Sequence, residues 1–152
     1  MNKRKLILEQ TDRKILLLKK AESLVMPSTG WIFTIRTALG MSMRQLGKKM
    51  GITAQSVKEI EEREKNKSVS LKVLNQFAEA LDLKLIYGFV PKSGKLEDLI
   101  EKRALDMAKE IVGRTSMTMK LEDQENDPKR IKKAIGEKAE ELKREMPNYL
   151  WN

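Results

Sequence analysis

The chain has 152 residues, a formal net charge of +9 and 35% charged residues, and it contains neither cysteine nor histidine. Without cysteine there is no disulfide framework and no thiolate zinc site, and without histidine the commonest general base and metal ligand is missing. The composition therefore argues against an enzyme, and we predict neither a cofactor nor a metal site. Such a basic chain favours polyanionic partners, nucleic acid before anionic membrane.

No segment indicates export or a membrane span. The apolar run "ILLL" at residues 15–18 has a lysine on either side and is far too short to cross a bilayer. The chain also lacks a P-loop and a nucleophile-elbow motif. Because the absence of cysteine fits a reducing compartment, we expect a cytoplasmic protein.

The sequence predicts two helices before residue 41. Residues 1–26 read as a basic amphipathic helix whose apolar residues recur at helical spacing, and "MPSTG" then breaks the pattern. A second helix follows in "GWIFTIRTALG", ending at Gly40. Its apolar face is predicted to comprise Trp31, Ile32, Ile35, Ala38 and Leu39.

The most informative stretch is "ALGMSMRQLGKKMGITAQSVKEIEERE", which places two short amphipathic segments almost head to tail. Gly51 permits the left-handed turn that ends the first helix, and Gly47 allows the second helix to cross closely. Ser42 and Gln45 match a capping box, and Thr53 is placed to cap the second helix. The residues expected to face inward are Leu46, Met50, Ile52, Val57 and Ile60. Together these features predict a helix-turn-helix within residues 30–82.

The second helix of this pair carries the residues expected to read double-stranded DNA. In a major-groove docking Gln55 can pair with adenine, Ala54 can touch a thymine methyl group, and Lys58 can bind guanine or phosphate. Helix N-termini and basic side chains would hold the phosphates. The predicted contacts are Ser42, Arg44, Thr53, Ala54, Gln55, Ser56, Lys58 and Arg63. Four acidic residues at the end of this helix argue against tight binding unless part of the run pairs with nearby lysines or faces away from DNA: Glu59, Glu61, Glu62 and Glu64.

Beyond these helices the chain predicts one more core helix and a strand. "SLKVLNQFAEALDL" has helical period with Ser70 as its N-cap, whereas "LKLIYGFVP" alternates apolar residues and predicts a strand over residues 83–91. A lone strand does not persist unpaired. It would pair either with its counterpart in a homodimer or with the edge of a partner's sheet, and we favour the dimer.

The C-terminal region, residues 95–152, is predicted to hold two or three helices. "KLEDLIEKRALDMAKEIVG" has a clean apolar stripe, and "RTSMTMKLEDQEN" is compatible with a short helix. The last helix opens with Asp127 as N-cap and Pro128 at its first position. If this region served mainly to hold a partner protein, we would expect unusual exposure of Met107, Ile111, Met117 and Met119.

Several of these segments resemble known families. Residues 31–82 resemble the lambda-repressor-like, xenobiotic-response-element helix-turn-helix family. The whole chain resembles the family called mobile mystery protein A, in "GWIFTIRTALGMSMRQLGKKMGIT", "LKVLNQFAEALDLKLIYGFVP", "LEDLIEKRALDMAKEIVG", "TMKLEDQ" and the final "LW". That resemblance implies an antitoxin and autoregulator encoded beside a Fic-domain partner. The implied fold is mainly α, with a five-helix DNA-binding core, one β-strand and a C-terminal helical extension.

A Fic-inhibitory helix carries a serine or threonine, then a glutamate four residues later and a glycine or asparagine after it. Ser93 with Glu97 and Thr118 with Glu122 match the first two positions, and both matches end in aspartate. Because the second match lies within "TMKLEDQ", Thr118 and Glu122 are the candidate inhibitory residues. The alternative is that residues 118, 119 and 121 pack the C-terminal helices while Glu122 is solvated.

Overall fold

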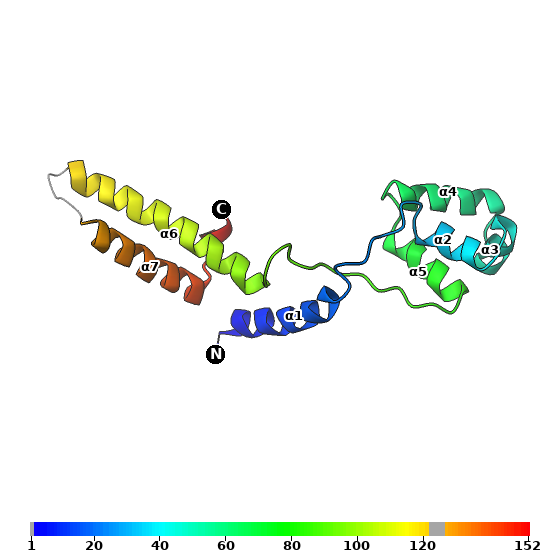
Figure 1. Cartoon of the computed structure of the whole chain (residues 1–152), viewed down its shortest axis with the longest axis horizontal. Coiled ribbons are helices and arrows are strands. Elements are labelled where there is room, and N and C mark those ends of the chain that lie inside the picture. The colour runs from blue at the N-terminus through cyan, green and yellow to red at the C-terminus, as the bar shows by residue number, and fades with distance from the viewer. Residues whose placement is uncertain (1, 122–126) are drawn as a thin grey trace. The chain divides into compact units, whose positions relative to one another are not determined.

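The protein is described here by a computed structural model covering residues 2–121 and 127–152. The chain divides into two compact units, residues 21–88 on the one hand and residues 1–20 with 89–152 on the other. Seven α-helices and one short 3-10 helix account for the regular structure of the described residues, which include no strand (Figure 1). The expectation of a mainly helical protein is therefore confirmed.

Residues 21–88 form a unit of four helices around one apolar core. The helices are α2 (Trp31–Ala38), α3 (Met43–Met50), α4 (Ala54–Lys65) and α5 (Leu71–Ala80). All four contribute to the core, which comprises Ile32, Leu46, Val57, Ile60 and Phe77. The unit holds four helices where five were predicted, because α1 belongs to the other unit and no further helix follows α5 before residue 88.

The face that α2 buries differs from the predicted one. Ile32 is fully buried and Ile35 packs against the core, as expected, whereas Trp31 and Leu39 are exposed. Arg36 is buried although it was not among the residues predicted to face inward. A helix of eight residues has room for few inward positions, and here a charged residue takes one of them.

Each of the next three helices begins at a side-chain cap that the sequence predicted. The Ser42 hydroxyl accepts a hydrogen bond from Gln45 N (3.1 Å), and Gln45 Oε1 accepts one from Ser42 N (2.8 Å), which completes the capping box. Thr53 Oγ1 accepts from Ser56 N (3.1 Å), and Ser70 Oγ accepts from Val73 N (3.1 Å). These bonds satisfy backbone donors that a helix N-terminus otherwise leaves free.

Arg36 and Glu61 form a buried ion pair that joins α2 to α4. Arg36 Nε donates to Glu61 Oε1 at 2.5 Å and Nη2 to Oε2 at 3.3 Å, and both side chains are less than a tenth exposed. Arg36 Nη1 also donates to the Met41 carbonyl (2.9 Å) in the turn before α3. One guanidinium therefore connects two helices and the intervening turn, and each partner would be left as a buried charge without the other.

Residues 83–90 do not form the predicted strand. The Leu83 amide donates to the Ala78 carbonyl (2.8 Å), but no backbone–backbone hydrogen bond follows from residue 84 to 90 within the described part of the chain. Ile86, Tyr87 and Phe89 are exposed. The alternating pattern had indicated a strand, but a strand requires a neighbouring strand, and the described residues provide none.

The other unit is built on a helical hairpin. Its helices are α1 (Lys3–Lys19), α6 (Leu96–Leu121) and α7 (Pro128–Glu145), followed by the 3-10 helix η1 (Asn148–Trp151). Helices α6 and α7 run side by side in opposite directions (Figure 1). Ala104, Met107, Ala108, Leu142 and Leu150 form their core. Asp127 caps α7 as predicted, and "RTSMT" continues α6 rather than starting a separate helix.

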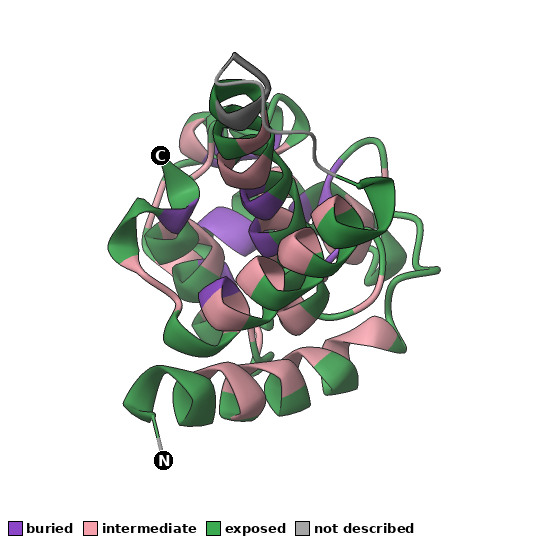
Figure 2. Ribbon diagram, turned by 90° about the vertical axis from the view of Figure 1, so that its left-hand side faces the viewer, coloured by how far each residue is buried: buried purple, intermediate pink, exposed green. Residues whose placement is uncertain are grey.

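Polar contacts hold α1 and the C-terminal tail to this hairpin. The Asp12 carboxylate accepts hydrogen bonds from the amides of Leu96 (2.9 Å) and Glu97 (3.3 Å) at the N-terminus of α6. Arg4 donates to the Met146 carbonyl (2.6 Å) and Arg103 to the Leu150 carbonyl (2.6 Å). Helix α1 ends at Lys19, short of the predicted residue 26, and contains no buried residue (Figure 2).

Replacing Arg36 by methionine should destabilise the helix-turn-helix unit by about 3–5 kcal/mol, because Glu61 would stay buried without a partner. The change would be measured by urea unfolding of a Trp151→Phe background, in which Trp31 alone reports on residues 21–88. The double substitution Arg36→Met, Glu61→Leu should recover most of the loss.

The matched control for this experiment is Lys72→Met at an exposed position of α5 in the same unit. It removes the same charge and should change stability by no more than about 0.5 kcal/mol. Equal losses for Arg36→Met and Lys72→Met would contradict the importance of the buried pair.

Candidate nucleic-acid interface

The turn between α3 and α4 is as tight as the sequence predicted. Gly51 has a φ of 71° and lies in the left-handed region that favours glycine. The Ile52 amide donates to the Gly47 carbonyl (2.8 Å), so the chain turns back onto α3 directly after Gly51. A Cβ on Gly47 would lie 2.6 Å from the Ile52 carbonyl oxygen. Only glycine at position 47 allows this approach without a shift of the backbone.

The inward residues of the helix pair meet as expected. Leu46 from α3 and Val57 from α4 are fully buried, Ile60 is buried beside them, and Met50 and Ile52 pack against the same core. Two helices that meet at a sharp turn and share one apolar core define a helix-turn-helix. The rotation of α4 about its axis is thereby fixed, so that residues on the side opposite Val57 and Ile60 face outward.

The outward residues of α4 include the predicted base-reading positions. Ala54, Gln55 and Lys58 are exposed, and the described structure gives their side chains no hydrogen bond or ion pair within the chain. Ser56 is half-buried and accepts a hydrogen bond from the Thr53 hydroxyl (3.0 Å), so it supports the helix cap. Of the four, Ala54, Gln55 and Lys58 are thus available for an external partner.

The remaining predicted contacts lie on the helix ends and the basic surface. Ser42 and Thr53 are the exposed N-caps of α3 and α4, and Arg44 and Arg63 are exposed on the same two helices. Lys48 and Lys49 line a shallow depression of about 540 Å³ with residues of the α2–α3 turn. Exposed cations and free helix N-termini are the features that hold phosphate groups.

The acidic run at the end of α4 is largely structural. Glu61 pairs with Arg36, and Glu64 Oε1 accepts the Ile32 amide (2.7 Å) in the first turn of α2. That turn begins at Gly30, which has no capping side chain, so Glu64 takes the place of a cap. Only Glu59 and Glu62 of the run remain exposed. The sequence had suggested that these acidic residues pair with lysines or face away from DNA, but it gave no sign of Arg36 and the Ile32 amide as their partners.

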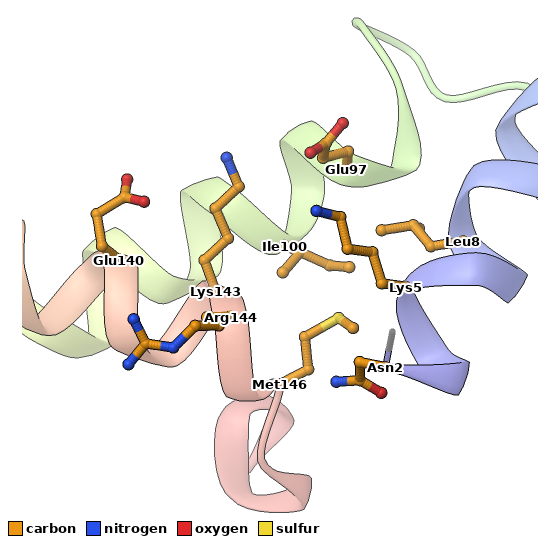
Figure 3. A pocket seen from close by; sticks show the side chains of 9 residues that line it. All are labelled: Asn2, Lys5, Leu8, Glu97, Ile100, Glu140, Lys143, Arg144 and Met146. Atoms are coloured by element: carbon orange, nitrogen blue, oxygen red, sulfur yellow. The ribbon is translucent and has the colours of Figure 1, made fainter.

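A second concave surface lies in the other unit, between α1 and the α6–α7 hairpin (Figure 3). This groove measures about 550 Å³ and has Leu8, Ile100 and Met146 among its lining residues. The charged residues around it are of both signs: Lys5, Glu97, Glu140, Lys143 and Arg144. Lys143 is itself paired with Glu101 (3.6 Å). Such a mixed rim favours no particular charge in a ligand.

The candidate Fic-inhibitory residues are described only in part. Thr118 is exposed near the end of α6, and its hydroxyl donates to the Arg114 carbonyl (3.0 Å). Glu122 lies outside the described residues. The apolar residues named as markers of a partner surface differ in their burial. Met107 is buried, Ile111 packs against the core and Met117 is exposed. The side chain of Met119 is also outside the described set.

Comparison with known proteins gives a match for the unit of residues 21–88. The family model HTH_3, described as helix-turn-helix, matches residues 32–87, which cover α3 to α5 and all of α2 except its first residue, Trp31. The unit is therefore an XRE-type helix-turn-helix domain, and this family is a DNA-binding family rather than an enzyme family. Searches of curated proteins and of solved structures give no significant match. Within the described residues, no helix is both long and apolar enough to cross a membrane.

Replacing Gly47 by alanine should destabilise the helix-turn-helix unit by about 1–3 kcal/mol, because the new methyl group would force α4 away from α3. Trp31 fluorescence during urea unfolding would measure the change. As a control, Gly136→Ala in α7 places a methyl group where no atom lies within 4 Å. It should stabilise its helix by about 0.5–1 kcal/mol, measured through Trp151. Wild-type stability of the Gly47→Ala variant would mean that the two helices do not approach closely at this point.

Proposed function

We propose that this protein is a sequence-specific DNA-binding transcriptional regulator. The observation that carries the proposal is the division of α4 into a packed side and a free side. The side chains of Val57, Ile60 and Glu61 are buried in the fold. Those of Gln55 and Lys58 are exposed and form no side-chain contact that the described structure records. The residues that remain free have donor and acceptor groups suited to base edges.

In this proposal the N-terminal part of α4 enters the major groove. Gln55 pairs with adenine through its amide, Ala54 contacts a thymine methyl group, and Lys58 binds guanine or a nearby phosphate. Ser56 holds Thr53 in place at the helix cap, where the free backbone amides of α4 can bind phosphate. The other phosphate contacts come from Ser42, Arg44 and Arg63. Glu59 and Glu62 lie about one and two turns beyond Gln55 along α4.

We also propose that the regulator binds DNA as a homodimer. Helix-turn-helix proteins commonly read two half-sites about one helical turn apart, and a second copy supplies the second recognition helix. Residues 84–90 support this proposal, because their backbone groups have no backbone partner in the described chain and Ile86, Tyr87 and Phe89 are exposed. A second copy could cover these residues.

The regulator is further proposed to act as the antitoxin and autorepressor of a Fic-domain partner. Support comes from the resemblance of the whole chain to the mobile mystery protein A family. Thr118 and Glu122 are the residues proposed to inhibit the partner. An alternative within this proposal is that the C-terminal helices hold the partner and DNA binding is secondary; the exposed Met117 on α6 favours such a contact at one position.

The double substitution Gln55→Ala, Lys58→Ala should weaken binding to the DNA upstream of the protein's own gene by at least about 30-fold, since each of the two lost base contacts costs about 1–3 kcal/mol. Fluorescence anisotropy over a salt series would measure the effect, and binding should weaken steeply as salt rises. At saturation the complex should contain two copies of the chain for each duplex.

The control is Lys72→Ala, Gln76→Ala, which removes the same residue types from exposed positions of α5 in the same unit. It should leave the affinity within about threefold, because only general charge is lost. Equal, weak binding of the wild-type protein to upstream and scrambled duplexes would refute the proposed regulator function.

Replacing Glu122 by glycine should release the Fic-domain partner from inhibition. The substitution removes the carboxylate that, in Fic-inhibitory helices, competes with the γ-phosphate of the nucleotide. The measurement is nucleotide transfer by the partner in the presence of each variant. Glu97→Gly, at the glutamate of the other motif match, should leave inhibition intact. Full inhibition by Glu122→Gly would rule out this mechanism and leave the DNA-binding function untouched.

A further inference from the structure

Helix α1 presents an outward face that combines aliphatic and basic residues. Leu6 is 42% exposed, Ile7 52%, Leu16 62% and Leu17 73%. Leu6 and Leu17 are three helical turns apart and therefore lie on one line along the helix, with Ile7 and Leu16 on either side. The four exposed side chains thus form two apolar pairs, Leu6 with Ile7 and Leu16 with Leu17, one toward each end of the helix, with Gln10 and Arg13 between them.

The inward side of α1 faces the α6–α7 hairpin and contacts it. Asp12 bonds to the first amides of α6, Arg4 bonds to the Met146 carbonyl, and Leu8, Ile15 and Leu18 are half-buried. These contacts fix which side of α1 faces the hairpin. The outward leucines are consequently not part of the packing that holds α1 in its own unit.

The charge of this segment is almost entirely of one sign. Residues 1–20 contain the basic residues Lys3, Arg4, Lys5, Arg13, Lys14, Lys19 and Lys20, and the acidic residues Glu9 and Asp12. Asp12 is engaged with α6 and Glu9 is half-buried. At 100° per residue, Lys3, Arg13, Lys14 and Lys20 fall beside the line through Leu6 and Leu17. Glu9, half-buried, lies as far from this line as Lys14 does, on the other side. The outward leucines are thus flanked by four basic residues and one acidic residue.

We infer that this face of α1 binds an acidic amphipathic helix of a partner protein. Leucines of such a helix would cover Leu6 and Leu17, and its glutamates would pair with Arg13 and Lys14. This surface goes beyond the proposed DNA-binding function, because it uses neither α4 nor any residue of the helix-turn-helix unit.

Other occupants fit the same face less well. A second copy in antiparallel contact, with Leu6 against Leu17, would set Lys3 against Lys20 at both ends and bring like charges together. DNA phosphates would pair with the lysines but would leave the leucines exposed to water. An anionic membrane would have to accept Gln10 and Arg13, which lie within the leucine line and interrupt its apolar character. An acidic amphipathic helix would both cover the exposed leucines and pair with the basic side chains.

The test uses a synthetic peptide that forms an amphipathic helix with a leucine stripe bordered by glutamates. The full-length protein should bind it at least about 10-fold more tightly than either of two variants, Leu6→Ala with Leu17→Ala or Arg13→Glu with Lys14→Glu. Binding would be measured by fluorescence anisotropy of the labelled peptide at low salt. A second peptide, in which lysines replace the glutamates, should bind at least about 10-fold more weakly to the wild-type protein.

The control variant Lys132→Glu, Lys133→Glu makes the same charge change at exposed positions of α7 and should bind the acidic peptide almost like the wild type. The inference is overturned if the wild-type protein does not bind the acidic peptide, if the control loses as much affinity as the α1 variants, or if the lysine peptide binds equally well. Binding to anionic lipid vesicles that depends on the same α1 residues, without peptide binding, would assign the face to a membrane and also overturn it. Because none of the substituted residues is buried, circular dichroism should show an unchanged helical content for every variant.

Discussion

The buried ion pair between Arg36 and Glu61 is the interaction on which the helix-turn-helix unit depends. It joins α2 to α4, and the third bond of Arg36, to the Met41 carbonyl, holds the turn that leads into α3. A buried pair adds little net stability compared with apolar packing, but breaking it leaves a charge in a low-dielectric interior. The pair therefore acts mainly on geometry. With Glu61 and Val57 turned inward, Gln55 on the same helix faces outward, so the pair between α2 and α4 helps to decide which residues of α4 are exposed.

The parts of the fold that the sequence predicted correctly are those decided by neighbouring residues. Ser42 with Gln45, Thr53, Ser70 and Asp127 cap their helices by bonds that span two or three positions. Gly47 and Gly51 act through the local backbone, one by allowing a close approach and the other by taking a positive φ. In such cases the physical requirement and the residue that meets it lie within one turn of helix, and a pattern of residue types is enough to recognise them.

The parts that the sequence did not predict depend on contacts between distant residues. The alternating apolar residues at 83–90 match the period of a strand, yet a strand exists only beside another one, and periodicity gives no information on the neighbour. Arg36 was not among the residues predicted to face inward, and its partner lies 25 positions away on α4, beyond the reach of a local pattern. Asp12 likewise caps a helix 84 positions further along the chain. The candidate DNA-reading residues could be named from the sequence of α4 alone. The contacts of Glu61 with Arg36 and of Glu64 with the Ile32 amide could not, because both partners lie on α2.

The excess positive charge of the chain is spread over surfaces of different chemistry. On the helix-turn-helix unit the exposed cations of α3 and α4 accompany polar residues such as Gln55 and Ser42, and this combination suits the phosphates and base edges of DNA. On α1 the cations instead accompany exposed leucines. Net charge alone would assign both surfaces to nucleic acid. The neighbouring side chains distinguish them, because a phosphate backbone gains nothing from Leu17, whereas a protein helix can cover that leucine and neutralise Arg13 at the same time.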